Sequence, residues 1–189
     1  QAVRDLEPIL AARVDAMGLR QQLDRDLELS WVLADMERVG ILVDAESLAR
    51  LGTDFEAEKN EVERKIHALA GRAFNVASTK QLGEVLFDEL KLPVIKRTKT
   101  GYSTDVDVLE QLATKHEIAS AVLRHRTLAK LINTYTDVLQ KAVVPADGRV
   151  HATFQQTTGA SGRLISTDPD LQRTPVKTPE GKRIREAFI

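Results

Sequence analysis

The chain of 189 residues contains no cysteine, four histidines and few aromatic residues, at 4%. The absence of cysteine excludes a disulfide framework, a thiolate metal site and a cysteine nucleophile, and it suits a reducing compartment. The histidines show no HExxH or similar spacing, so we expect no metal site and no cofactor held by this chain alone. The length is nevertheless sufficient to bury a substantial apolar core without covalent staples.

Long apolar runs are also missing. The longest are far shorter than the roughly twenty residues that cross a bilayer, and the N-terminal QAVRDLEPIL lacks a signal-peptide core, so no membrane partner is expected. The net charge of −1 conceals an asymmetry. Residues 1–74 hold 10 Lys and Arg against 15 Asp and Glu, whereas residues 75–189 hold 17 against 13. An anionic partner is therefore expected to bind the second part.

Apolar residues at helical spacing dominate the first three quarters of the chain. They predict a helix at about residues 20–39 that ends at Gly40, and a longer one from about Asp44 to Gly71. The longer helix would have about seven turns and a length of roughly 40 Å. A second long helix is predicted from 118 to 141, and we expect the two long helices to form an antiparallel pair.

Shorter elements fill the rest of the pattern. Ser78 with Gln81 forms a capping box for one short helix, and Thr104 with Asp107 opens another. After Pro145 the pattern changes, because RVHATFQQT alternates like a strand and IREAFI is a candidate for another short strand. These elements predict a mainly α (α+β) fold.

The segment KLPVIKRTKTGYSTD combines four cations with hydroxyls and a glycine, and no acid occurs in it before Asp105. Charge and short donors of this kind suit phosphate oxygens, although a solvated loop has a similar composition. A second candidate is FNVASTKQ, where a helix N-terminus would offer free amides beside Lys80. An ordinary helix cap is the alternative there.

The most unusual stretch is FQQTTGASGRLISTDPDLQ at residues 154–172, which places hydroxyls, amides and glycines around Arg163. It has neither the GK[ST] of a nucleotide-binding P-loop nor the GxSxG of a hydrolase elbow. One interpretation is a structural turn rich in Ser and Gly. The other is a minor-groove reader, because that groove shows acceptors at the same positions for every Watson–Crick pair. Arg163, Gln156 and Gln172 would then sense pair geometry without sensing sequence.

The segment VHATFQQTTGASGRLISTDPDLQRTPVKTPEGKRIREAF resembles a segment of family A DNA polymerases, the bacterial DNA polymerase I type. VLADMERVGILVD, LAGRAFNVASTKQLGEVLFDELKLP, KRTKTGYSTDVDVLEQLA and LAKLINTYTDVL also match that family, in its order, so the resemblance covers about residues 25–189. It implies a thumb at 25–142 with long antiparallel helices and short helices at the tip, then the beginning of a palm at 143–189 with a few β-strands. Residues 1–24 would be the tail of a preceding exonuclease-like domain or a linker.

The resemblance also implies contacts with double-stranded primer–template DNA. Arg163 would reach the minor groove near the primer terminus, and Gln172 would lie by the same duplex. The basic segment adds Lys96 and Arg97 to the predicted DNA-binding residues, and the stretch around Arg163 adds Gln156 and Arg173. By the same resemblance, the remaining predicted DNA-binding residues are Asn75, Ser78, Lys80, Lys99, Thr100, Ser103, Thr104, Lys130, Thr134 and Tyr135.

Five residues depart from the family pattern. Gly159 replaces a threonine, Ile165 a serine and Ile132 a lysine, while Asp170 and Arg173 each replace an asparagine. An aspartate repels phosphates, and isoleucine donates no hydrogen bond. The primer-terminus contacts are therefore expected to be weaker or rearranged, with Arg173 supplying charge.

The family binds two Mg²⁺ ions on palm carboxylates in DYSxIE and HDE segments, and neither segment occurs in this sequence. These residues alone are therefore expected not to polymerise. For the intact parent the resemblance implies Mg²⁺, deoxynucleoside triphosphates, DNA replication and repair, a monomer, and a cytoplasmic, nucleoid-associated location. Two alternatives stay open, a stand-alone helical DNA-binding module and a protein-interaction scaffold of paired helices.

Overall fold

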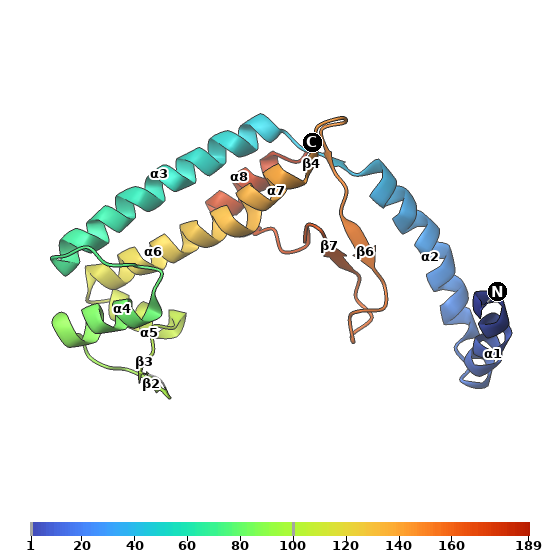
Figure 1. The fold of residues 1–189 in the computed structure, drawn as a ribbon, viewed down its shortest axis with the longest axis horizontal. Helices are drawn as coiled ribbons and strands as arrows, with labels where there is room; N and C mark the ends of the chain where they lie inside the picture. Colours follow the sequence, from blue (N-terminus) through green and yellow to red (C-terminus); the bar gives the residue numbers. More distant parts are fainter. Residues whose placement is uncertain (1, 100) are drawn as a thin grey trace. The chain divides into compact units, whose positions relative to one another are not determined.

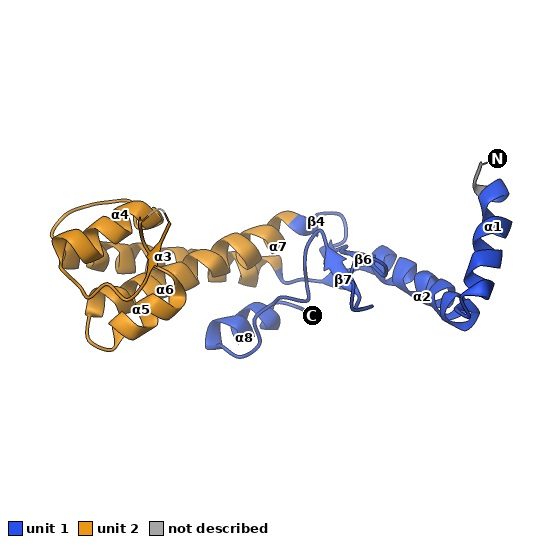
Figure 2. Ribbon diagram, turned by 90° about the horizontal axis from the view of Figure 1, so that it is seen from below, with its two compact units in different colours: residues 1–44, 142–189 blue, residues 45–141 orange. Residues whose placement is uncertain are grey.

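The computed structural model describes residues 2–99 and 101–189, and the chain divides into two compact units (Figures 1 and 2). Ala45–Lys141 form one unit, and Gln1–Asp44 with Ala142–Ile189 form the other. Helices predominate, and the strands are two or three residues long. The predicted mainly α (α+β) class is confirmed.

The unit 45–141 is built on two long helical rods. The first is α3 (Ala45–Ala70), as the apolar stripe predicts. The second begins with α6 (Glu117–Leu131), passes through the π-helical turn η2 (Ile132–Thr136) and ends with α7 (Asp137–Ala142). The sequence predicts this second rod as one helix and gives no sign of the π-helical turn.

The two rods lie side by side and run in opposite directions (Figure 1). Lys65 near the end of α3 pairs with Glu117 at the start of α6, at 2.6 Å between nitrogen and oxygen. Near the other end, a Cβ on Gly52 would lie 3.5 Å from the Cβ of Thr136. The predicted antiparallel pair is therefore confirmed.

Short elements gather at one end of the rods (Figure 1). They are α4 (Thr79–Gly83), the π-helical turn η1 (Glu84–Glu89), the hairpin of β2 (Arg97–Thr98) and β3 (Gly101–Tyr102), and α5 (Val106–Ala113). Their apolar side chains form one core with those of the rods. Its members that are at most 2% exposed are Ile66, Val76, Leu82, Val85, Leu86, Val108, Leu109, Leu112, Ala119 and Val122.

The N-termini of the two short helices differ in detail from the predictions. Ser78 caps α4 by accepting a hydrogen bond from the Gln81 N–H at 3.4 Å, but the Gln81 carboxamide accepts from Asn75 N–H instead of completing the capping box. At α5 the N-cap is Asp105 and not Thr104. The Thr104 hydroxyl accepts a hydrogen bond from Arg126 at 3.1 Å, so it is not available to cap the helix.

The other unit begins with α1 (Ala2–Ala16) and α2 (Arg20–Val39). Gly40 ends α2 with φ of 65°, as predicted, and a Cβ at this position would lie 2.9 Å from the His151 ring and from the Val150 carbonyl oxygen. Only glycine satisfies both the left-handed backbone and the close contact.

Two small antiparallel sheets follow. β1 (Ile41–Leu42), β5 (Arg149–Val150) and β4 (Val143–Val144) form a three-stranded sheet in that order. β6 (Thr153–Gln155) pairs with β7 (Ile165–Thr167) in the second sheet. The alternating segment predicted as one strand is thus split between β5 and β6.

The segment predicted as a strand at residues 184–189 begins as a helix, so that prediction is wrong. α8 (Pro179–Glu186) covers its first half, and Thr178 caps the helix by accepting a hydrogen bond from Gly181 N–H at 3.1 Å. Proline at the first helical position after a threonine cap is a helix-start signal that outweighs a short apolar alternation. Only Phe188 forms a bridge, with Val43.

Candidate nucleic-acid interface

The loop before α4 and the first turn of that helix hold three of the predicted DNA-binding residues. The Asn75 carboxamide accepts a hydrogen bond from Ala77 N–H at 3.0 Å, and Ser78 caps the helix. Lys80 is exposed on the first turn and lines a cavity of about 370 Å³ that Tyr102 of the β2–β3 hairpin also lines. The structure therefore brings the two cationic segments together.

The β2–β3 hairpin is held by Tyr102. Its hydroxyl donates to an Asp88 carboxylate oxygen at 2.5 Å, and its ring lies 4.9 Å from the Phe87 ring. The Arg97 guanidinium lies 4.8 Å from the centre of the Tyr102 ring, within the range of a cation–π contact. The hydrogen bond to Asp88 is the main reason that the Tyr102 pKa is raised.

The cations of the hairpin differ in their surroundings. Lys96 pairs with Asp105 at 3.3 Å, whereas Lys99 is exposed and forms no ion pair with the residues that the structure describes. The pKa of Asp105 is lowered, first by a hydrogen bond with Ser103 and then by Lys96. The predicted contact at Thr100 lies outside the described residues. Lys99 is thus the cation of the hairpin that is most available to an anion.

Ser103 and Thr104 are buried, with 1% and 5% of their surface exposed. The Ser103 hydroxyl accepts from Asp105 N–H at 3.3 Å, and Thr104 accepts from Arg126 through both its hydroxyl and its carbonyl oxygen. Both hydroxyls therefore have protein partners, and their predicted contact with DNA stays a prediction.

Arg126 is a candidate that the sequence reasoning missed. It is half-buried on α6, donates to the Thr104 carbonyl oxygen at 2.5 Å, and lines a cavity of about 290 Å³ beside Ala77 and Thr79. Burial lowers its pKa, but a guanidinium stays protonated at neutral pH. Its spacing of four residues from Lys130 was the available signal, because residues four apart share a helix face.

The remaining predicted residues of this unit lie at and just beyond the end of α6. Lys130 and Thr134 are exposed, and Tyr135 is buried with 7% of its surface exposed. Lys130 and Thr134 are one helical turn apart, so they extend the face that begins with Arg126. Tyr135 packs inward from the same turn.

In the other unit, Arg163 lies on a short ribbon between β6 and β7. Gly162 N–H donates to the Gly159 carbonyl oxygen at 2.9 Å and closes a tight turn just before the arginine. The Arg163 side chain is exposed and has no partner among the described residues. It is available to a ligand.

The other three predicted residues of this unit contact their own chain. Gln156 donates to the Asp26 carbonyl oxygen at 2.9 Å, and the Arg173 guanidinium lies 3.0 Å from an Asp170 carboxylate oxygen. The Gln172 carboxamide bonds to the backbone of β7 and of the residue before it. Of the four, Arg163 has the freest polar group.

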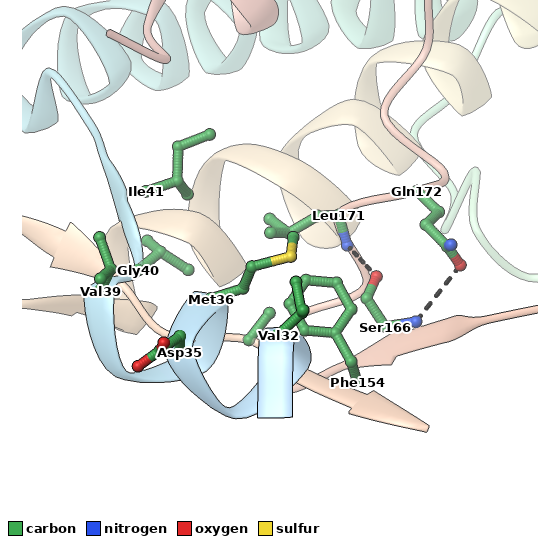
Figure 3. Close-up of a pocket in the computed structure, with 12 residues that line it drawn as sticks. Val32, Asp35, Met36, Val39, Gly40, Ile41, Phe154, Ser166, Leu171 and Gln172 are labelled. Carbon is green, nitrogen blue, oxygen red and sulfur yellow. Dashed lines mark hydrogen bonds between the residues drawn. The ribbon is translucent and has the colours of Figure 1, made fainter. Parts of the chain in front are cut away.

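The same unit contains an apolar cavity of about 680 Å³, which Ser166 and Gln172 also line (Figure 3). Val32 and Met36 of α2 line it together with Phe154 and Leu171. Both of these α2 side chains are half exposed, at 55% and 49%.

Two kinds of feature are absent from the described residues, 2–99 and 101–189. No helix among them is long and apolar enough to span a membrane. They also contain no group of three or more histidine or carboxylate side chains that could hold a metal ion. The Mg²⁺ that the resemblance implies for the parent therefore does not fit the residues present.

Comparison with known proteins decides the family. The sequence model of the protein family "DNA polymerase family A" matches residues 45–189. The chain belongs to DNA polymerase family A. The resemblance on which the sequence interpretation depends is thus confirmed.

Relatives within family A cover most of the chain. DNA polymerase I of Bacillus subtilis is 46% identical over 175 residues, which are 93% of this chain and 20% of the relative. The thermostable DNA polymerase I of Thermus thermophilus is 50% identical over 163 residues, or 85% of this chain and 20% of the relative. The chain thus spans about a fifth of the length of these curated relatives.

A solved structure extends the match to the fold. The polymerase domain of Pol1 from M. smegmatis, in complex with DNA primer–template and dNTP, superposes with a TM-score of 0.91 and 41% sequence identity. The match covers 100% of this chain and 33% of that domain.

Four of the departures from the family A pattern lie in pairs in the structure. Asp170 and Arg173 form an ion pair at 3.0 Å, so each charge is partly offset by the other. A Cβ on Gly159 would lie 3.5 Å from the Ile165 Cδ1, so the isoleucine occupies space beside the missing side chain. Ile132 is 7% exposed and packs in the core.

Proposed function

We propose that these residues are the thumb, at 25–142, and the beginning of the palm, at 143–189, of a longer DNA-directed DNA polymerase. Their task is to hold double-stranded primer–template DNA through its phosphates and minor groove, without sequence preference, and to position the primer end. Residues 1–24 would belong to a preceding exonuclease-like domain or a linker.

The observation that carries this proposal is the match over the whole chain to a polymerase domain solved with primer–template and dNTP. At 41% identity and a TM-score of 0.91, both the sequence and the fold agree. The parent reaction would be template-directed transfer of a deoxynucleotide to a primer 3′-hydroxyl, with release of pyrophosphate. We assign the parent to DNA replication and repair, as a cytoplasmic, nucleoid-associated monomer.

The two units would have different tasks. In the unit 45–141, Lys80, Lys99, Arg126 and Lys130 offer positive charge to phosphate oxygens, which supplies affinity but no sequence information. In the other unit, Arg163 would donate to acceptors in the minor groove beside the primer terminus.

The chemistry of nucleotide transfer would lie outside these residues. Mg²⁺ and deoxynucleoside triphosphates are assigned to the intact parent, because the sequence of these 189 residues does not contain the DYSxIE and HDE segments on which the family binds Mg²⁺. The 189-residue chain alone is therefore expected to bind DNA without extending a primer.

Fluorescence anisotropy of a labelled primer–template with the 189-residue chain tests the proposal. The measurement is made at about 50 and about 200 mM salt, and each phosphate contact should contribute about −0.9 to the slope of log K against log salt. Two duplexes of unrelated sequence should bind equally. A protein-interaction scaffold would bind neither duplex, and this outcome overturns the proposal.

A further inference from the structure

Within the part of the chain that the structure describes, the strand β7 has one edge that no other strand covers. β7 pairs with β6 in the register that places Ile165 opposite Gln155, Ser166 opposite Phe154 and Thr167 opposite Thr153. Because backbone groups of successive residues point to opposite sides of a strand, those of Leu164 and Ser166 point away from β6. An unpaired edge of this kind needs other hydrogen-bond partners.

The Gln172 carboxamide supplies those partners. Its nitrogen donates to the Leu164 carbonyl oxygen at 3.0 Å, and its oxygen accepts from the Ser166 N–H at 3.2 Å. Figure 3 shows the bond between Ser166 and Gln172 beside the one from Leu171 N–H to the Ser166 hydroxyl. The side-chain amide thus takes the place that the peptide group of a neighbouring strand would occupy.

Gln172 is itself held in position. The Ser166 hydroxyl is buried and accepts from Leu171 N–H at 3.0 Å, and Gln172 N–H donates to the Asp170 carboxylate at 3.2 Å. The segment after β7 is therefore tied back to the strand at Leu171 and Gln172, and Asp170 braces the Gln172 backbone. Because Gln172 is held in this way, its carboxamide can hold the backbone of Leu164 and Ser166 in place.

The backbone of Gly159 lies close to that of Arg163. A Cβ on Gly159 would lie 2.9 Å from the Arg163 carbonyl oxygen, closer than real side chains approach. The next carbonyl along the chain, that of Leu164, receives the bond from Gln172. The carbonyl group next to Arg163 in the chain is thus held by Gln172, while the Arg163 guanidinium is exposed.

We propose that Gln172 is a positioning residue, whose carboxamide closes the outer edge of β7 and sets the direction in which Arg163 leaves the ribbon. This inference rests on the proposed function of Arg163 at the primer terminus. The family resemblance implies that Gln172 lies by the duplex; the hydrogen bonds assign its carboxamide to the protein backbone.

Amide hydrogen exchange of the 189-residue chain without DNA tests whether the Gln172 carboxamide protects the edge of β7. In Gln172→Ala the Ser166 amide should exchange about 3- to 10-fold faster, as expected for the loss of one net hydrogen bond. The Ile165 amide faces β6 and should change much less. Gln172→Met keeps the size of the side chain but removes the amide, so it should behave like the alanine variant.

Gln111→Ala is the matched control. Gln111 also donates to a backbone carbonyl, that of Asp107 at 3.2 Å, but on an exposed helix turn. It should leave the Ser166 amide unchanged. Equal acceleration of the Ser166 and Ile165 amides in Gln172→Ala, or wild-type exchange in Gln172→Met, would overturn the proposal.

A double-mutant cycle in the intact polymerase tests the consequence. Gln172→Ala should slow nucleotide addition when Arg163 is present and change it by less than about twofold in an Arg163→Ala background, because both substitutions remove one effect. Independent, multiplicative losses mean that Gln172 contacts DNA itself, and they overturn the proposal. Failure of the proposed function is distinguishable, because a chain that does not bind DNA can still show the exchange pattern.

Discussion

The two units bury their apolar side chains to very different extents. Among the leucine, isoleucine and phenylalanine side chains of the described residues that are less than 2% exposed, only Ile184 belongs to the unit formed by residues 1–44 and 142–189. That same unit exposes Trp31 at 78% and Ile9 at 66%. The unit 45–141 therefore has its own hydrophobic core, whereas the other unit depends more on hydrogen bonds between side chains and backbone.

This difference matches the tasks that we propose for the units. A packed core holds cations on a rigid surface, which suits binding to a regular phosphate backbone. A ribbon held by a few polar contacts can present one guanidinium close to a groove floor. Affinity and positioning are then separable by substitution.

The largest expected effect is loss of stability from the core of the unit 45–141. Phe55 is 1% exposed, and Phe55→Ala should lower the free energy of unfolding by about 3–5 kcal/mol. Phe154 is half-buried and already lines a cavity, so Phe154→Ala should cost about 1–2 kcal/mol. Urea unfolding followed by circular dichroism measures both.

Val138→Ala is the control, because Val138 is 38% exposed on α7 and its truncation should change stability by less than about 0.5 kcal/mol. If the two phenylalanine variants lose equal stability, the contrast between the units is wrong.

Sequence reasoning succeeded where an apolar stripe determines the structure. Leu48, Leu51 and Phe55 recur at helical spacing, and all three are buried on α3. It failed at β7, which is three residues long and completes its hydrogen bonding with the side chain of Gln172. No periodicity can report a bond between a strand and a glutamine six or more residues away.

The candidate site was predictable to a similar degree. Exposed cations such as Lys99 follow from composition, because a basic segment without acids must face solvent or an anion. Arg126 was missed because its contact with Thr104 joins residues far apart in sequence. The burial of Ser103 was likewise invisible, since hydroxyls in a polar segment look exposed until the tertiary fold is known.

The second prediction concerns Arg163 in the intact polymerase. Arg163→Ala should slow nucleotide addition by about 10- to 100-fold, because one hydrogen bond to a charged group contributes about 1.5–3 kcal/mol. DNA affinity should change by less than about threefold, because most affinity comes from phosphate contacts. Single-turnover kinetics and anisotropy measure the two effects separately.

Arg50→Ala provides the control, since Arg50 is exposed on α3 and pairs with Glu46. It should change neither quantity. Equal losses of rate and affinity in Arg163→Ala would argue against a role at the primer terminus.

The third prediction concerns the cations of the hairpin. Lys99→Ala should weaken DNA binding and flatten the slope of log K against log salt by about 0.9. Replacing Lys96, Arg97 and Lys99 together should flatten the slope by about one unit for each phosphate that is no longer neutralised. The change should be less than about three units, because Lys96 already pairs with Asp105.

Anisotropy with the 189-residue chain gives these slopes, and Lys141→Ala on α7 is the matched lysine control. An unchanged slope in the triple variant would mean that the hairpin does not contact DNA.

The smallest expected effects are the pH dependences contributed by one histidine in each unit, and they have opposite signs. In the unit 45–141, His125 is buried, and desolvation lowers its pKa, opposed by Glu63 and supported by Lys59 and Arg126. The folded state therefore favours the neutral ring. The contribution of His125 to stability is fully present above the unfolded pKa of about 6.5 and is lost as the pH falls below it.

His151 in the other unit has the reverse behaviour. Its Nδ1 lies 2.7 Å from the Glu37 carbonyl oxygen, and its Nε2 lies 3.0 Å from an Asp147 carboxylate oxygen. Both partners can only accept, so the protonated ring is the form that donates to both of them. The bond to Glu37 and then Asp147 raise the His151 pKa, while Arg149 opposes them.

The stability contributed by His151 is therefore fully present below about pH 6.5 and is lost as the pH rises through its folded pKa. Urea unfolding between about pH 5.5 and 8 separates the two histidines. The stability of the wild type relative to His125→Phe should rise with pH, because only the wild type must exclude a proton from a buried ring. Relative to His151→Gln it should fall with pH, because glutamine can still donate to Asp147 but never carries the charge. Slopes of the same sign for both variants would mean that at least one ring has the opposite protonation state in the folded chain.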